Sequence, residues 1–173
     1  ATSGRTTLAG EGLQHQDGQG LIMASMIPNC ISYDPTYAYE MATIIEDGIK
    51  RMHTNKESIF YYITALNENY KHPEIPKHVK KEDILKGMYL FKEFRNKGKT
   101  IVQLFGSGSI LNETIKAAEI LSKDFGIDSD VWSITSYSEI QRNGAEIQRW
   151  NQLHPDKKPK ETYEINSLGT LNL

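Results

Sequence analysis

The chain contains a single cysteine and no long apolar run. Cys30 cannot form a disulfide within the chain, which favours a reducing, cytoplasmic environment. The longest apolar stretch, around residues 21–27, is much shorter than the roughly 20 residues of a membrane-spanning helix and follows no basic secretory region. The five histidines and the cysteine are scattered without metal-ligand spacing, so we expect no membrane span and no zinc site.

The chain also has little net charge. Its 173 residues include 20 Lys+Arg and 22 Asp+Glu, a formal net charge of −2 at pH 7. This balance argues against nucleic-acid binding through bulk positive charge. Hydrophobic residues make up 38% and charged residues 24%, which excludes a chain that is disordered throughout. The length suits one ordinary domain or two small ones.

The first half of the chain predicts alternating strands and helices after a glycine-rich loop over residues 1–20. Residues 30–33 predict a short strand, with Asp34 as the N-cap of a helix over residues 36–52. Residues 58–66 form a nearly unbroken apolar run, typical of a strand covered on both faces. The helix should bury the residues at three- and four-residue steps, namely Tyr39, Ala42, Ile45, Ile49 and Met52.

The second half predicts a strand, a helix and a parallel strand. A short helix over residues 80–86 and a strand over 88–94 precede a charged break at residues 95–99, where we expect a domain boundary. The next elements are strands at residues 100–105 and 130–136 and helices at 110–125 and 138–153, with Gly126 as a helix C-cap. A helical crossover between two strands implies that they are parallel.

Each half has fewer strands than the five or six of a typical sheet. The chain also begins without methionine, and its last residues, 164–173, show neither a helix stop nor a clear strand. We therefore expect an α/β fold that is incomplete, as in a piece of a longer chain.

Several residues could carry chemistry. The turn Gly106-Ser107-Gly108-Ser109 could hold a phosphate, but it matches no dinucleotide or P-loop motif, so we favour a structural turn with Ser109 as helix N-cap. Cys30 is expected to be a buried structural thiol. Four histidines are expected to be solvated loop residues: His53, His72, His78 and His154.

The glycine-rich first loop is the best candidate for catalysis. It places Glu11, Gln14, His15 and Asp17 within seven residues, between glycines that let the backbone approach a ligand closely. A histidine can hold or donate a proton near pH 7, and a nearby carboxylate can tune it. Spacing alone leaves open whether this is a catalytic or an ordinary surface loop.

The same loop begins a set of ordered segments that closely resemble the homodimeric bacterial pyruvate dehydrogenase family, which uses thiamine diphosphate. These segments are residues 2–18, 27–40, 61–70, 104–111, 117–121 and 149–155. The resemblance covers about the first 155 residues and fades after about Lys160.

The resemblance implies an incomplete thiamine-diphosphate-binding, transketolase-like fold with parallel sheets and crossover helices. Residues 1–96 would be the C-terminal part of the middle, pyrimidine-binding domain, and residues 97–173 the start of the C-terminal domain. The parent enzyme would be a cytoplasmic homodimer with its active site between subunits. It would decarboxylate pyruvate with thiamine diphosphate and magnesium, and would pass the acetyl unit to the lipoyl group of a dihydrolipoamide acetyltransferase.

By the same resemblance, His15 matches the family's active-centre histidine and Glu11 an acidic residue of that loop. The chain departs from the family in having Gln19-Gly20 where a further histidine is expected, and it lacks the Gly-Asp-Gly motif that holds diphosphate and magnesium. The chain's own residues are therefore expected to hold neither cofactor nor metal. Two alternatives stay open: a truncated, non-catalytic remnant or interaction segment of that enzyme, and a nucleotide-binding module built on Gly106–Ser109.

Overall fold

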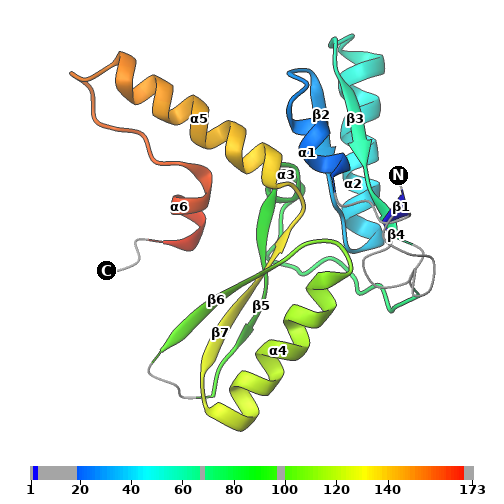
Figure 1. Cartoon of the computed structure of the whole chain (residues 1–173), viewed down its shortest axis with the longest axis vertical. Coiled ribbons are helices and arrows are strands. Elements are labelled where there is room, and N and C mark those ends of the chain that lie inside the picture. Colours follow the sequence, from blue (N-terminus) through cyan, green and yellow to red (C-terminus); the bar gives the residue numbers. More distant parts are fainter. Residues whose placement is uncertain (1, 4–18, 67–68, 97–99, 170–173) are drawn as a thin grey trace.

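The computed structural model describes residues 2–3, 19–66, 69–96 and 100–169 of the chain. Strands and helices alternate along the chain, as predicted (Figure 1). Most predicted elements are confirmed within a few residues. The elements are β1 (Thr2–Ser3), α1 (Gly20–Ser25), β2 (Cys30–Tyr33), α2 (Ala38–Ile49), η2 (Lys50–Thr54), β3 (Phe60–Ile63), β4 (Ala65–Leu66), α3 (Lys81–Leu85), β5 (Met88–Phe94), β6 (Ile101–Gly106), α4 (Ile110–Phe125), β7 (Asp128–Ile134), α5 (Tyr137–Leu153) and α6 (Tyr163–Leu168).

The N-terminal part, through β4, is built on two parallel strand pairs. β2 pairs with β3, and β1 pairs with β4. Thr64 separates β3 from β4, so the predicted strand over residues 58–66 is divided in two. The expectation that this run is covered on both faces is wrong for Phe60, which is 43% exposed.

The C-terminal part is a three-stranded sheet in the order β5-β7-β6. The predicted crossover is confirmed, since α4 joins β6 to β7 and these two strands are parallel. β5 corrects the expectation of purely parallel sheets, because it pairs antiparallel with β7. The boundary at residue 97 stays a prediction, and the pairing of β5 with β7 favours a division that keeps β5 with the second part.

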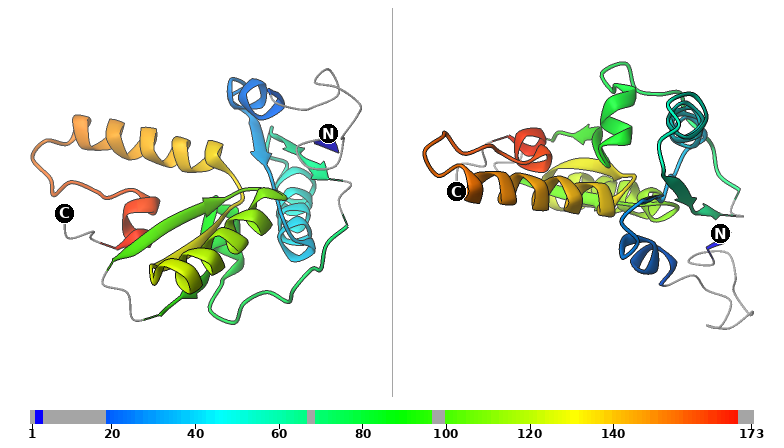
Figure 2. Two further views of the ribbon diagram at one scale, coloured as in Figure 1. Left: turned by 60° about the horizontal axis from the view of Figure 1, so that its bottom comes forward. Right: turned by 90° about the horizontal axis from the view of Figure 1, so that it is seen from above.

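The two faces of this sheet are covered by different helices (Figure 2). Successive residues of a strand point to opposite faces. On β7, Val131 packs with Leu111 and Ala118 of α4, whereas Trp132 packs with residues of α5 and α6. The short helix α6 was not predicted, and it ends at Gly169, whose φ of 73° is favoured by glycine.

Helix α2 buries a different face from the one expected. Its fully buried or nearly buried residues are Glu40, Thr43, Ile44 and Gly48. Ile45, Ile49 and Met52 of the predicted face are instead 38–58% exposed. The sequence therefore predicted the helical period correctly but the wrong buried face. The face that is buried includes the polar residues Glu40 and Thr43. The α-helix ends at Ile49, before the predicted end at residue 52, and the chain continues as the π-helical turn η2 through Thr54.

Apolar clusters join the two parts of the chain. Ile31, Tyr33 and Ile44 of the N-terminal part pack with Ile84 and Tyr89. In a second cluster, Tyr37 packs with residues of α4 and β7. Burial of this surface holds α2 and β2 against the three-stranded sheet. No helix among the described residues is long and apolar enough to cross a membrane.

Candidate functional site

The two predicted catalytic residues, His15 and Glu11, lie in residues 4–18, outside the described residues. The described residues that flank this segment are Ser3, the last residue of β1, and Gln19, which precedes α1. β1 runs parallel to β4, so the segment leaves from the carboxyl end of a parallel strand. Ligands of open α/β sheets bind preferentially outside the carboxyl ends of the strands.

The carboxyl ends of four strands meet around Asp34, which directly follows β2. Its carboxylate accepts hydrogen bonds from the hydroxyls of Thr64, after β3, and Ser107, after β6, the latter at 2.7 Å. The Asp34 backbone N–H donates to the carbonyl of Thr135, after β7, at 2.7 Å, and its own carbonyl accepts from the Gly108 N–H at 3.1 Å. Asp34 therefore ties the two parts of the chain together at one edge.

Asp34 is not the N-cap of α2, which corrects the prediction. The N-cap is Tyr37, whose φ of −111° and ψ of 156° are extended. Asp34 is 3% exposed and directed to partners distant in sequence. Glu40, in the first turn of α2, caps the start of the helix instead, because its carboxylate accepts from the backbone N–H groups of Thr36 and the N-cap residue Tyr37.

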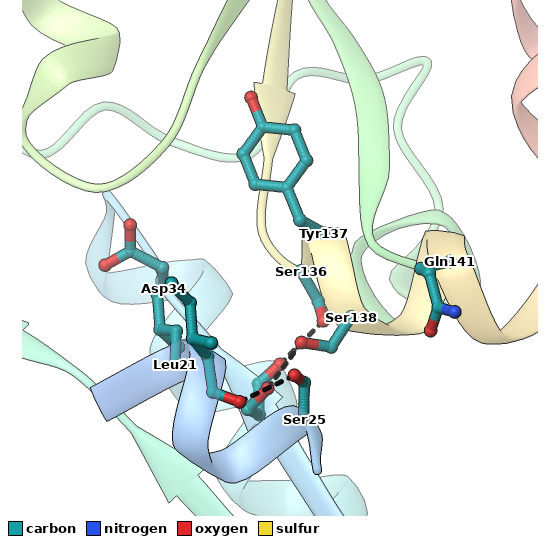
Figure 3. Close-up of a pocket in the computed structure, with 9 residues that line it drawn as sticks. Leu21, Ser25, Asp34, Ser136, Tyr137, Ser138 and Gln141 are labelled. Carbon is teal, nitrogen blue, oxygen red and sulfur yellow. Dashed lines mark hydrogen bonds between the residues drawn. The ribbon is translucent and has the colours of Figure 1, made fainter. Parts of the chain in front are cut away.

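A cleft of about 500 Å³ opens beside Asp34 (Figure 3). Its walls come from α1, the end of β2 and the start of α5, and its residues are Leu21, Ile22, Ser25, Ser32, Asp34, Ser136, Tyr137, Ser138 and Gln141. Leu21 is only two residues beyond Gln19, so the cleft adjoins the point where the 4–18 segment returns to the described fold.

Five of the nine cleft residues carry a hydroxyl group, and two of these hydroxyls bond to each other. The Ser32 hydroxyl donates to the Ser138 hydroxyl at 2.9 Å, and the Ser136 hydroxyl donates to the Ser32 carbonyl at 2.6 Å. Partial burial, and then the nearby Asp34, raise the pKa of Tyr137, whose phenol would be protonated at neutral pH even without this shift. Hydroxyl and amide groups can bind a polar ligand by hydrogen bonds. The cleft lining includes no histidine, lysine or arginine.

The glycine-serine turn is held by several contacts with the rest of the fold, which agrees with the structural turn favoured from the sequence. Gly108 has a φ of 54°, and a Cβ on Gly106 would lie 2.6 Å from the Leu111 Cα. The Thr36 hydroxyl donates to the Gly108 carbonyl at 2.7 Å, and Asp34 engages the Ser107 hydroxyl and the Gly108 N–H. Ser109 occupies the N-cap position, but its side chain does not cap the helix.

Cys30 is a buried structural thiol, as predicted. It is 1% exposed, and burial raises its pKa, which keeps it in the unreactive protonated form. Among the described residues there is no cluster of three or more histidine, cysteine, aspartate or glutamate side chains that could hold a metal ion.

His72 and His78 are exposed loop residues, as predicted, whereas His53 lies on η2 and His154 is half-buried after α5. His72, His78 and His154 also make specific contacts. The His72 Nδ1 accepts a hydrogen bond from the Ala38 N–H at 3.0 Å. A ring nitrogen of His78 lies 2.8 Å from the Leu90 carbonyl oxygen. His154 contacts the Trp150 carbonyl and stacks on the Trp150 ring, with ring centroids 4.5 Å apart. Sequence spacing could not have found these contacts, because in two of the three the partner is distant in the chain.

Two family models match the chain. The model of the pyruvate dehydrogenase E1 component middle domain matches residues 1–73, and that of the transketolase-like TK C-terminal domain matches residues 87–167. The second match corrects the expectation that the resemblance fades after about Lys160, since it continues through residue 167.

Curated relatives and solved structures agree with these matches. The chain is 54% identical over 168 residues to the pyruvate dehydrogenase E1 component of Pseudomonas aeruginosa, covering 97% of this chain and 19% of that protein. It is 55% identical over 164 residues to that of Escherichia coli, covering 94% and 18%. The chain thus spans about a fifth of the length of these relatives.

The fold is similar to part of a transketolase. A transketolase variant from Pichia stipitis, crystallised with fructose 6-phosphate, superposes with a TM-score of 0.56 at 20% identity, over 91% of this chain and 19% of that one. At this identity the likeness shows the fold alone. The segments that suggested the family from the sequence, the two family models and the curated relatives agree, and the chain belongs to the pyruvate dehydrogenase E1 component family.

Proposed function

We propose that this chain provides an active-centre segment of a pyruvate dehydrogenase that works with thiamine diphosphate and magnesium. The parent enzyme decarboxylates pyruvate and transfers the acetyl unit to the lipoyl group of a dihydrolipoamide acetyltransferase, and it acts as a homodimer in the cytoplasm. The observation that carries the proposal is the identity of 54–55% to E1 components over nearly the whole chain.

In this proposal His15 and Glu11 act at the substrate. The His15 imidazole hydrogen-bonds to the substrate-derived group or transfers a proton to it, and the Glu11 carboxylate tunes that imidazole. Two structural facts support the role. Ser3, the described residue before this segment, is the last residue of β1, and Gln19, the described residue after it, is two positions from Leu21 of the cleft.

The described residues do not fit a diphosphate and its magnesium ion. No metal-binding cluster is found among them, and in the Gly106–Ser109 turn the Ser107 hydroxyl and the Gly108 N–H bond to Asp34. We therefore assign the cofactor to other parts of the parent protein.

Substitution in the full-length parent enzyme tests the proposal. We expect His15→Ala to lower kcat by about 10²–10⁴-fold, the usual effect of losing a proton-transfer group, and Glu11→Gln to lower it less. His53→Ala is the matched control, because His53 is an exposed histidine of η2. Turnover of the His15→Ala enzyme equal to that of the control would retire the assignment of His15.

The partner is tested by separating the two half-reactions. The full-length enzyme should reduce an artificial electron acceptor with pyruvate alone, and should acetylate an isolated lipoyl domain of the acetyltransferase. Acetylation of a lipoyl domain whose lipoyl-lysine is replaced by arginine would contradict the proposed acceptor.

A further inference from the structure

Glu40 is a fully buried carboxyl group that the proposed reaction does not use. It lies in the first turn of α2 and is 0% exposed. None of the ion pairs of the described residues includes it. A buried carboxyl group without a counter-charge is costly unless hydrogen bonds satisfy its oxygens.

Four hydrogen-bond donors satisfy the Glu40 carboxyl group: two backbone N–H groups just before α2, one hydroxyl on β5 and one hydroxyl on β7. Its Oε2 accepts from the backbone N–H groups of Thr36 at 2.5 Å and Tyr37 at 2.9 Å. Its Oε1 accepts from the Tyr89 hydroxyl of β5 at 2.5 Å and from the Ser133 hydroxyl of β7 at 2.6 Å. One oxygen thus caps helix α2, while the other bonds to the sheet of the C-terminal part.

A further contact joins α2 to β5. The Tyr39 hydroxyl, also on α2, lies 2.5 Å from the Tyr89 hydroxyl. Tyr89 therefore bonds to two successive residues of the first turn of α2. Because Tyr89 and Ser133 lie on neighbouring antiparallel strands and are paired in register, a rotation of α2 on the sheet would break several of these bonds together.

We propose that Glu40 is a lock between the two parts of the chain: its carboxyl group, held by Tyr89 and Ser133, fixes the orientation of α2 on the β5-β7-β6 sheet. The lock depends on hydrogen bonds rather than on charge. An amide can replace the carboxyl group, because a glutamine oxygen can accept from the two backbone N–H groups while its NH₂ donates to the Tyr89 and Ser133 hydroxyls.

Amide hydrogen exchange of the full chain tests the lock through Glu40→Leu and Glu40→Gln. We expect Glu40→Leu to speed exchange about tenfold or more in the first turn of α2 and also in peptides of β5 and β7. Glu40→Gln should leave both regions close to wild type. Glu46→Leu is the matched control on the same helix, because the Glu46 side chain is 67% exposed and pairs only with Lys81 at the surface.

Two outcomes would overturn the proposal. Faster exchange confined to α2 in Glu40→Leu would mean that Glu40 is only a local helix cap. Unchanged exchange in α2, β5 and β7 would mean that Glu40 does not fix the orientation of α2 on the sheet. If Glu40→Leu does not fold, Tyr89→Phe and Ser133→Ala each remove one donor and keep the core filled. Each should then speed exchange in α2 as well as in its own strand, and exchange confined to its own strand would contradict the lock.

Discussion

The Ser107 hydroxyl donates a 2.7 Å hydrogen bond to the Asp34 carboxylate, across 73 positions of sequence. This bond joins the turn after β6 to the residue that follows β2, at the edge where the carboxyl ends of the parallel strands meet. Thr64 donates to the other carboxylate oxygen, so a single side chain connects three segments.

Asp34→Ala should destabilise the chain by about 1–3 kcal/mol, because it leaves the Thr64 hydroxyl, 1% exposed, without this acceptor. Asp34→Asn should cost less, since one oxygen still accepts. Chemical denaturation measures both. Asp124→Ala, at an exposed position of α4, is the control. An Asp34→Ala chain as stable as this control would show that the junction contributes little.

Two glycine substitutions should shift stability in opposite directions. Gly106→Ala should destabilise by about 1–3 kcal/mol, because its Cβ would lie 2.6 Å from the Leu111 Cα, a backbone atom that cannot move aside cheaply. Gly144→Ala lies within helix α5 with its nearest neighbour at 4.0 Å, and it should stabilise by about 0.5–1 kcal/mol. Thermal melts compare the two variants with wild type. Changes of the same sign would contradict this account.

Stability should depend on pH through Glu40. Burial raises the pKa of Glu40 above its ordinary value of 4.5, although hydrogen bonds from Ser133, Tyr89, Tyr37 and Thr36 oppose the shift. The folded chain therefore holds this proton more tightly than the unfolded chain does. The contribution of Glu40 is complete below about pH 4.5 and is lost as the pH rises through the raised pKa of the folded state.

The measurement for this prediction compares wild type with Glu40→Gln, which does not titrate. Denaturation midpoints over a series of pH values from 4 upward should fall for wild type relative to the variant. A difference between the two chains that stays constant with pH would contradict a raised pKa for Glu40.

Cys30 should react with a thiol reagent only when the chain unfolds. It is 1% exposed, and burial raises its pKa, so little thiolate is present or accessible in the folded state. Because Cys30 is the only cysteine of the chain, the labelling rate reports on this residue alone. We expect labelling in native buffer to be at least about 100-fold slower than in denaturant. Equal rates would show that β2 opens freely.

Local signals in the sequence predicted most of the elements. The β6-α4-β7 crossover has an apolar strand at each end and Gly126, at a φ of 63°, where the helix stops. These signals lie within a few residues of one another, so no tertiary information is needed to read them. The short helices α1 and α6, of six residues each, were not predicted, whereas the even shorter α3 was, so length alone does not decide which helices a sequence reveals.

The sequence predicted only part of the candidate site. His15 and Glu11 were found from their resemblance to the family and stay predictions, since they lie outside the described residues. The cleft beside Asp34 had no signal in the sequence. Its walls come from α1, β2 and α5, and residues such as Ser32 and Ser138 are more than 100 positions apart.

The sequence by itself therefore determined the type and order of the main elements and the family, because both depend on residues that are close together or occur in long matching segments. Only the tertiary structure decided which face of α2 is buried, that β5 runs antiparallel to β7, and that Asp34 and Glu40 join the two parts of the chain. The reason is physical. A polar side chain is buried when distant donors satisfy it, and those donors are brought to it only by the packing of the whole fold.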